Sequence, residues 1–116
     1  MNLITAQAWA DEMDVRVTVC DHTGIIVYMN KTAALSMHNY GGYDLIGKSL
    51  LNCHNPRSSA IIKEMLERPF VNSYIVEKEG KRRLIRQFPW EEEGRFKGII
   101  EMSFPLPSDL EVKVRD

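Results

Sequence analysis

The second half of the chain consists of three extended segments separated by two short turns. Glu-Gly pairs at 79–80 and 93–94 form the turn centres. They separate segments at about 71–78, 82–90 and 95–104. In the last segment, apolar residues alternate with mostly polar ones, a period of two that is typical of a strand with one buried face. Strands joined by such short turns pair antiparallel, so this half of the chain predicts an antiparallel sheet.

The first half of the chain adds two more strands. Residues 15–20 alternate valine with arginine, threonine and cysteine, which predicts a half-buried strand. Asp21 and Gly24 suit the turn that follows, because aspartate can bond its own backbone and glycine permits positive φ. Residues 25–29 form a second and more continuously apolar strand. The two strands are therefore expected to make a β-hairpin.

Helices account for most of the remaining sequence. Apolar residues within 1–13 share one helical face. Asn30 is a suitable N-cap for a short helix over 31–37, and Asn55 can cap a longer helix over about 56–67. The order of elements predicts an α+β fold, in which short helices pack on one face of a five-stranded antiparallel sheet and a further helix precedes it.

Composition and charge limit the class of protein. A chain of 116 residues with 44% hydrophobic content fits one globular domain. Lys and Arg number 15 against 16 for Asp and Glu, so binding to nucleic acid is not expected. The sequence contains neither an apolar run of membrane-spanning length nor a secretory leader, so we expect a cytoplasmic location without membrane contact. There Cys20 and Cys53 are expected to be free thiols.

Three motifs, in this order and spacing, resemble those of PAS domains. Segment 21–30, Asp-x-x-Gly-x-Ile-x-Tyr-x-Asn, resembles the opening hairpin with its helix cap. Segment 43–48, Tyr-Asp-Leu-Ile-Gly-Lys, resembles an acidic, hydrophobic, glycine and basic stretch of that family. Segment 52–56 is similar to the Asn-Cys-His-Pro-Pro-like turn of a PAS subfamily often linked to hemerythrin-like regulatory domains, with Asn55 replacing the first proline. The resemblance covers about residues 14–104.

The resemblance implies a sensory module in signal transduction. A pocket between sheet and helices would bind a small molecule or cofactor, and the change would pass to a signalling partner protein. The chain would divide into an N-terminal helix for capping or homodimerisation (1–13), the PAS domain (14–104) and a C-terminal tail (105–116). No catalytic constellation is visible, so enzyme activity is not expected. The alternative is a protein-interaction adaptor whose core is filled by side chains and which binds no ligand.

Candidate site residues lie on the segments expected to border this pocket. If Arg86 faces inward, its guanidinium can bind a carboxylate in the pocket; the favoured interpretation places it on the solvent side of the sheet or beside Glu101 on the neighbouring strand. Cys53 and His54 are expected at the edge of the pocket. The apolar lining is expected to comprise Met29, Leu50, Ile62, Met65, Phe88, Ile100 and Met102.

His54 is also the candidate axial ligand of a haem, because a neutral imidazole nitrogen can bind haem iron. A haem-based redox or gas sensor is therefore a further alternative, against the simpler interpretation that His54 bonds backbone at the start of the helix. Asn52-Cys53 resembles the reactive stretch of flavin-binding photosensor PAS domains. However, His54 and Asn55 stand where that stretch needs Arg and Phe, so flavin is not expected.

Overall fold

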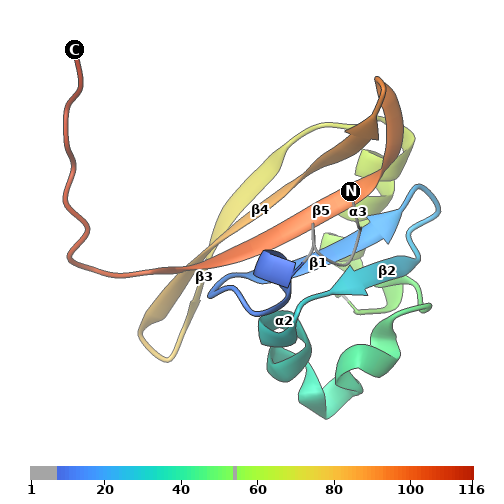
Figure 1. Cartoon of the computed structure of the whole chain (residues 1–116), viewed down its shortest axis with the longest axis horizontal. Helices are drawn as coiled ribbons and strands as arrows, with labels where there is room; N and C mark the ends of the chain where they lie inside the picture. The colour runs from blue at the N-terminus through green and yellow to red at the C-terminus, as the bar shows by residue number, and fades with distance from the viewer. Residues whose placement is uncertain (1–7, 54) are drawn as a thin grey trace.

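The computed structural model describes residues 8–53 and 55–116, and in them a five-stranded antiparallel sheet carries helices on one face (Figure 1). The strands, in the spatial order β2-β1-β5-β4-β3, are β1 (Arg16–Asp21), β2 (Ile26–Met29), β3 (Asn72–Lys78), β4 (Lys81–Glu92) and β5 (Arg95–Leu106). The helices are α2 (Lys31–Ser36) and α3 (Pro56–Glu67), with 3₁₀ turns η1 (His38–Tyr40), η2 (Gly42–Leu45) and η3 (Leu50–Cys53). The predicted α+β architecture is confirmed. None of the helices among these residues has the length and apolarity to span a membrane.

Asn30 connects β1, α2 and the segment before the sheet. Its side chain is buried, and its Oδ1 accepts hydrogen bonds from the backbone N–H groups of Val17 and Ala33, each at 3.0 Å. Its Nδ2 donates to the carbonyl oxygens of Ala10 and Val15 at 3.0 and 2.7 Å. The predicted N-cap is therefore confirmed, and the same amide also fixes the start of β1, a role that the sequence pattern does not reveal.

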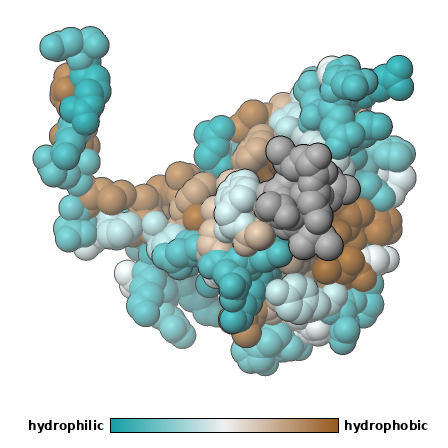
Figure 2. Space-filling view, in the orientation of Figure 1, coloured by the Kyte–Doolittle hydropathy of each residue, from teal (hydrophilic) through white to brown (hydrophobic). Residues whose placement is uncertain are grey.

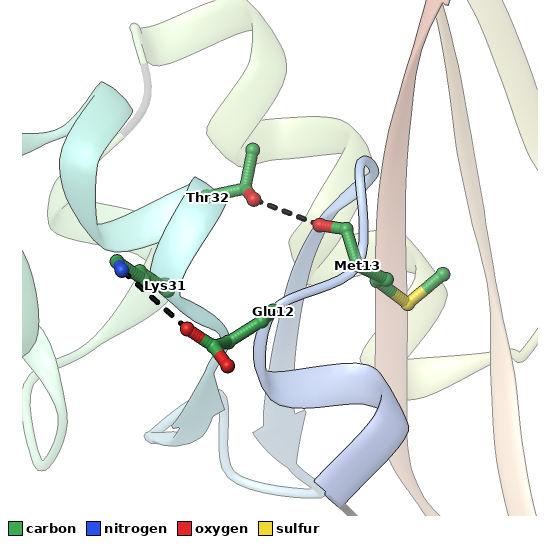
Figure 3. Close-up of polar contacts among 4 residues, drawn as sticks. All are labelled: Glu12, Met13, Lys31 and Thr32. Atoms are coloured by element: carbon green, nitrogen blue, oxygen red, sulfur yellow. Dashed lines mark hydrogen bonds and ion pairs between the residues drawn. The ribbon is translucent and has the colours of Figure 1, made fainter.

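The segment before β1 is also attached to α2 directly (Figure 3). Thr32 Oγ1 donates a hydrogen bond to the carbonyl oxygen of Met13 at 2.8 Å. Lys31 Nζ lies 3.5 Å from the carboxylate of Glu12 in an exposed ion pair, which adds little stability. Most of the helix predicted over 1–13 lies outside the described residues, so its part in dimerisation stays a prediction.

The least exposed part of the core lies where β1 and β5 run beneath α3. Cys20, Ile62, Met65 and Ile99 are each at most 1% exposed and belong to one apolar cluster. Gly98 precedes Ile99 on β5, and a Cβ atom there would lie 1.8 Å from the carbonyl oxygen of Cys20. Because no real contact is that short, only glycine permits this close approach of the two central strands.

The faces of β4 and of most of β5 are the reverse of those predicted. Ile85 and Gln87 on β4, and Ile99 on β5, are buried on the helix-covered side. The apolar side chains expected to face the helices lie on the opposite face: Leu84, Phe88, Trp90, Ile100, Met102 and Phe104. Both alternate sets contain large apolar residues, so the period of two predicts the strands but not which set faces the helices.

β5 continues to Leu106, past its predicted end at 104. Pro105 lies inside it, and β1 begins opposite Ser103, so this end of β5 has β4 as its one neighbour in the sheet. A proline lacks the N–H group, and it is tolerated in a strand at such an edge. Residues 107–116 leave the sheet as an extended segment (Figure 1), in which exposed apolar residues alternate with charged ones (Figure 2).

Candidate functional site

A cavity of about 190 Å³ lies between the sheet and helix α2. Strands β1, β2, β4 and β5 provide one wall, and α2, η2 and η3 provide the other. The lining residues are Arg16, Thr18, Ile26, Met29, Ala33, Ser36, Met37, Leu45, Leu50, Ile85, Glu101 and Ser103. The helical wall is apolar apart from one serine, whereas the sheet carries charged and hydroxyl groups. Such a space suits a small molecule with both an apolar and a polar part.

The acidic part of the sheet wall is held by a row of hydrogen bonds across three strands. Gln87 is 2% exposed, and its Nε2 donates to the carboxylate of Glu101 at 2.7 Å. Its Oε1 accepts a hydrogen bond from Asn72 Nδ2 at 2.9 Å. Burial raises the pKa of the nearby Tyr74 hydroxyl, and the charge of Glu101 raises it further, so this hydroxyl stays neutral at pH 7. The row fixes the position of Glu101 on the cavity wall.

Two arginines stand where this wall meets a neighbouring cleft: Arg16 lines both the cavity and the cleft, and Arg83 lines the cleft. Arg83 donates from Nε to Ser103 Oγ at 2.7 Å and from Nη2 to the Ser103 carbonyl oxygen at 2.8 Å. Arg16 on β1 is paired with the same serine in the register of the sheet. Burial lowers the pKa of the Arg83 guanidinium, the charge of Arg16 lowers it further, and Asp14 opposes both effects. The Arg83 guanidinium nevertheless remains charged at pH 7 because the pKa of arginine lies so far above neutrality.

The cavity continues into a larger cleft beside the β3–β4 hairpin, with a volume of about 1180 Å³. Arg16 and Ser36 line both spaces, so they stand at the opening between them. The charged residues that line the cleft are Arg16, Lys78, Glu79, Lys81, Arg82 and Arg83. Five of these six side chains are basic. The entrance to the cavity therefore has a positive potential that attracts anions.

The structure brings a minority of the predicted site residues to this cavity. Met29 and Leu50 line it, as expected. Ile62 and Met65 are buried in the adjoining core beneath α3 and are not part of the cavity wall. The remaining described candidates, on the opposite face of the sheet, are Arg86, Phe88, Ile100 and Met102. Arg86 is exposed on the face away from the cavity, in agreement with the favoured interpretation, and a ligand-binding role for these four residues stays a prediction.

Sequence reasoning missed the charged residues of the cavity wall. Glu101 lies between two residues of β5 that were expected to face inward. Arg16 likewise occupies a position of β1 that alternates with its apolar residues, so it was expected to face away from the core. Arg83 stands on the same strand as Arg86 but on the other face. The sequence signal for these residues was the polar residues at alternate positions of each strand. An argument from periodicity assigns such residues to the solvent side, so it did not select them for the site.

The described part of the cavity wall supplies no imidazole or thiolate for a haem iron. Its sulfur atoms are the thioethers of Met29 and Met37. Among the residues that the structure places, no group of three or more His, Cys, Asp or Glu side chains is arranged to hold a metal ion. His54 and the side chain of Cys53 lie outside the described part, so axial ligation by His54 stays a prediction.

Solved structures with this fold include several PAS domains. A C-terminal domain from Streptococcus mutans aligns with a TM-score of 0.72 at 18% identity, covering 90% of this chain and 85% of that one. The PAS domain of Bordetella pertussis BvgS aligns with a TM-score of 0.63 at 18% identity, covering 92% and 88% of the two chains. The Aer2 receptor from Vibrio cholerae, described as a dual PAS-haem oxygen sensor, aligns with a TM-score of 0.60 at 15% identity, covering 80% and 95%.

These similarities show that the chain has the fold of PAS domains, as the sequence motifs predict. No protein-family model matches the sequence, and no curated protein matches it. The finer assignment to the subfamily with the Asn-Cys-His-Pro-Pro-like turn stays a prediction.

Proposed function

We propose that the chain is a non-catalytic sensory module that binds a small molecule in the cavity beneath α2 and passes the resulting change to a partner protein. The observation that supports this most directly is the cavity itself. In a domain whose core is otherwise closely packed, a space lined by charged, hydroxyl and apolar side chains is a suitable ligand site. The structural similarity to PAS domains from sensor proteins agrees with this function.

The central strands suggest how a bound ligand could act at a distance. Thr18 and Glu101 pair with each other and line the cavity, while their chain neighbours Val19 and Ile100 pair on the opposite face of the sheet. A shift of β1 or β5 toward a ligand therefore also moves the apolar side chains of that face. A ligand with higher affinity for one arrangement of the strands would change the population of the surface that a partner contacts.

A matched pair of variants tests the role of the cavity. Ala33 is buried and lines it, whereas Ala60 is exposed on α3. In a thermal-shift screen of neutral and charged small molecules, we expect some compounds to raise the melting temperature of the wild type and of Ala60→Leu. Ala33→Leu should remove the response, because the larger side chain fills the cavity. If no compound binds, the adaptor without a ligand is the better description. If Ala33→Leu responds like the wild type, the ligand binds elsewhere and the cavity beneath α2 is not its site.

The haem alternative has a separate test. The protein should be incubated with haemin, and its absorption spectrum compared with that of His54→Ala. A Soret band that is present in the wild type and lost in the variant would establish a haem sensor with His54 as ligand. Absence of haem uptake would exclude this alternative without affecting the proposal of a ligand in the cavity beneath α2.

A further inference from the structure

We propose that the ligand of this cavity is a small organic acid, whose carboxylate lies between Arg16 and Arg83 and whose apolar tail occupies the space beneath α2. This inference rests on the proposed function, because it names the class of ligand for the same cavity. Three observations carry it: two arginines that form no ion pair among the described residues, the rigid placement of one of them, and the division of the cavity into a charged and an apolar part.

The two arginines have no carboxylate partner within the described part of the chain. The ion pairs there are Lys31–Glu12, Arg68–Glu64 and Arg82–Glu77. Arg16 and Arg83 nevertheless stand close enough for their charges to affect each other, and both are partly buried. Like charges held together in a partly desolvated site repel each other, and a bound anion between them removes that repulsion.

Arg83 is held in place before any ligand arrives. Its Nε and Nη2 atoms both donate to Ser103, which leaves Nη1 for a further acceptor. Arg16 approaches the same serine from the other side, on β1. A guanidinium that is already oriented loses less side-chain entropy on binding an acid, and its planar geometry matches that of a carboxylate.

The rest of the cavity favours a monoacid with an apolar tail over phosphate. Glu101 lies on the same wall, two residues from Ser103 along β5, which is roughly 7 Å in a strand. Its negative charge, with that of Asp14 near Arg83, disfavours a dianion. The apolar side chains that line the space include Ile26, Met29, Leu45 and Leu50. An aliphatic or aromatic tail placed there gains hydrophobic burial that phosphate cannot gain.

The approach to the site also suits an anion. Arg16 stands where the basic cleft meets the cavity, so an acid that enters from the cleft passes the lysines of the hairpin before it reaches the arginine pair. A positive potential along such a path increases the rate of association and makes it dependent on ionic strength.

Calorimetric titration of the full chain with matched probes tests the class of ligand. Hexanoate has the acid and the tail, hexanamide and hexan-1-ol have the tail alone, and acetate and phosphate have the anion alone. We expect hexanoate to bind at least about tenfold more tightly than every other probe, because only it satisfies both the charge-assisted hydrogen bonds and the apolar surface. Raising the salt concentration should weaken hexanoate binding and leave hexan-1-ol binding unchanged.

Variants identify the arginines that are responsible. Arg16→Gln removes a charge without breaking a hydrogen bond described in the structure and should weaken hexanoate binding about tenfold or more. Arg83→Lys keeps the charge but loses the planar fork, and an intermediate loss is expected. Arg86→Gln is the matched control: it lies on the same strand as Arg83 but faces away from the cavity, so hexanoate affinity should not change.

The outcomes separate this inference from the proposed function. If neutral probes bind as tightly as hexanoate, or if Arg16→Gln and Arg86→Gln have equal effects, the organic-acid site is wrong while a ligand in the cavity remains supported. If phosphate binds more tightly than hexanoate, the site is one for an inorganic anion and the inference fails. If no probe or screened compound binds and Ala33→Leu changes nothing, both proposals fail together.

Discussion

The layer between the sheet and the helices is filled at one end and hollow at the other. Beneath α3, Cys20, Ile62 and Met65 are fully enclosed in an apolar cluster. Beneath α2, the same two central strands present Arg16 and Glu101 to a cavity of about 190 Å³. Charged groups are costly to bury in a close-packed apolar core, so their presence distinguishes this end of the layer from the other. The comparison therefore separates the part of the domain that stabilises the fold from the part that is available for a ligand.

The two helices differ in a way that explains this division. α3 has 12 residues, more than three turns, and presents a continuous apolar stripe to β1 and β5. α2 has six residues, fewer than two turns, and the side chains that it buries are Ala33 and Ala34. Short side chains on a short helix leave space above the sheet, and the η2 and η3 turns close that space from the side.

The largest effect is expected from a substitution at the filled end. Gly98→Ala places a methyl group 1.8 Å from the Cys20 carbonyl oxygen, so β1 and β5 must separate. We expect the free energy of unfolding to fall by about 3 kcal/mol or more, the upper end of the range for overpacked cores. Urea denaturation followed by circular dichroism measures this change.

Gly94→Ala is the control for that experiment. Gly94 has positive φ, at 77°, unlike Gly98, and no atom lies within 4 Å of the added methyl group, so a loss of about 1–2 kcal/mol is expected from backbone strain alone. Equal losses in Gly94→Ala and Gly98→Ala would show that the central strands tolerate separation and that this end is not rigid.

A second pair of substitutions compares the two ends directly. Ile62→Ala leaves a new void in the packed cluster and should cost about 2–5 kcal/mol. Leu45→Ala removes a side chain that already borders an empty space and so makes fewer contacts, and we expect it to cost at least about 1 kcal/mol less. Both are measured by the same urea titration. If Leu45→Ala costs as much as Ile62→Ala, the hollow end and the filled end contribute equally to the free energy of unfolding. The distinction between a stabilising end and a ligand-binding end would then be wrong.

The elements of the fold could be predicted because local signals agreed with one another. The Asp21–Gly24 turn, the Asn30 cap and the Asn55-Pro56 helix start each involve residues close in sequence, and the structure contains all three. Alternation in the second half likewise identified three strands with the two Glu-Gly turns between them.

The site could be predicted only in part, because its position depends on which face of each strand meets the helices. Phe88 and Ile100 are more apolar than Gln87 and Glu101, so hydrophobicity favours the wrong face. In the structure, Gln87 is buried because Asn72 and Glu101 satisfy its amide. These three residues come from different strands, and their meeting depends on the register of the sheet, which alternation alone does not specify.

The smallest predicted effect concerns a titratable group at the filled end. Asp21 Oδ1 accepts hydrogen bonds from the backbone N–H and hydroxyl of Thr23, at 2.9 and 2.7 Å, and from the backbone N–H of Ile25 at 3.0 Å. Burial acts to raise the pKa of Asp21, but these hydrogen bonds and the charge of His22 outweigh it, so the pKa is lowered in the folded state. The ionised carboxylate therefore stabilises the turn that leads out of β1.

The sign of the pH dependence follows from this lowered pKa. The stabilisation is fully present above the unfolded value of about 3.9 and is lost as the pH falls through the lower pKa of the folded state. Asp21→Asn keeps an acceptor oxygen but cannot titrate. Measured by urea denaturation from about pH 5 to pH 2, its unfolding free energy should fall less steeply below pH 4 than that of the wild type. Parallel curves would show that Asp21 has the same pKa in both states and that the filled end is held by packing alone.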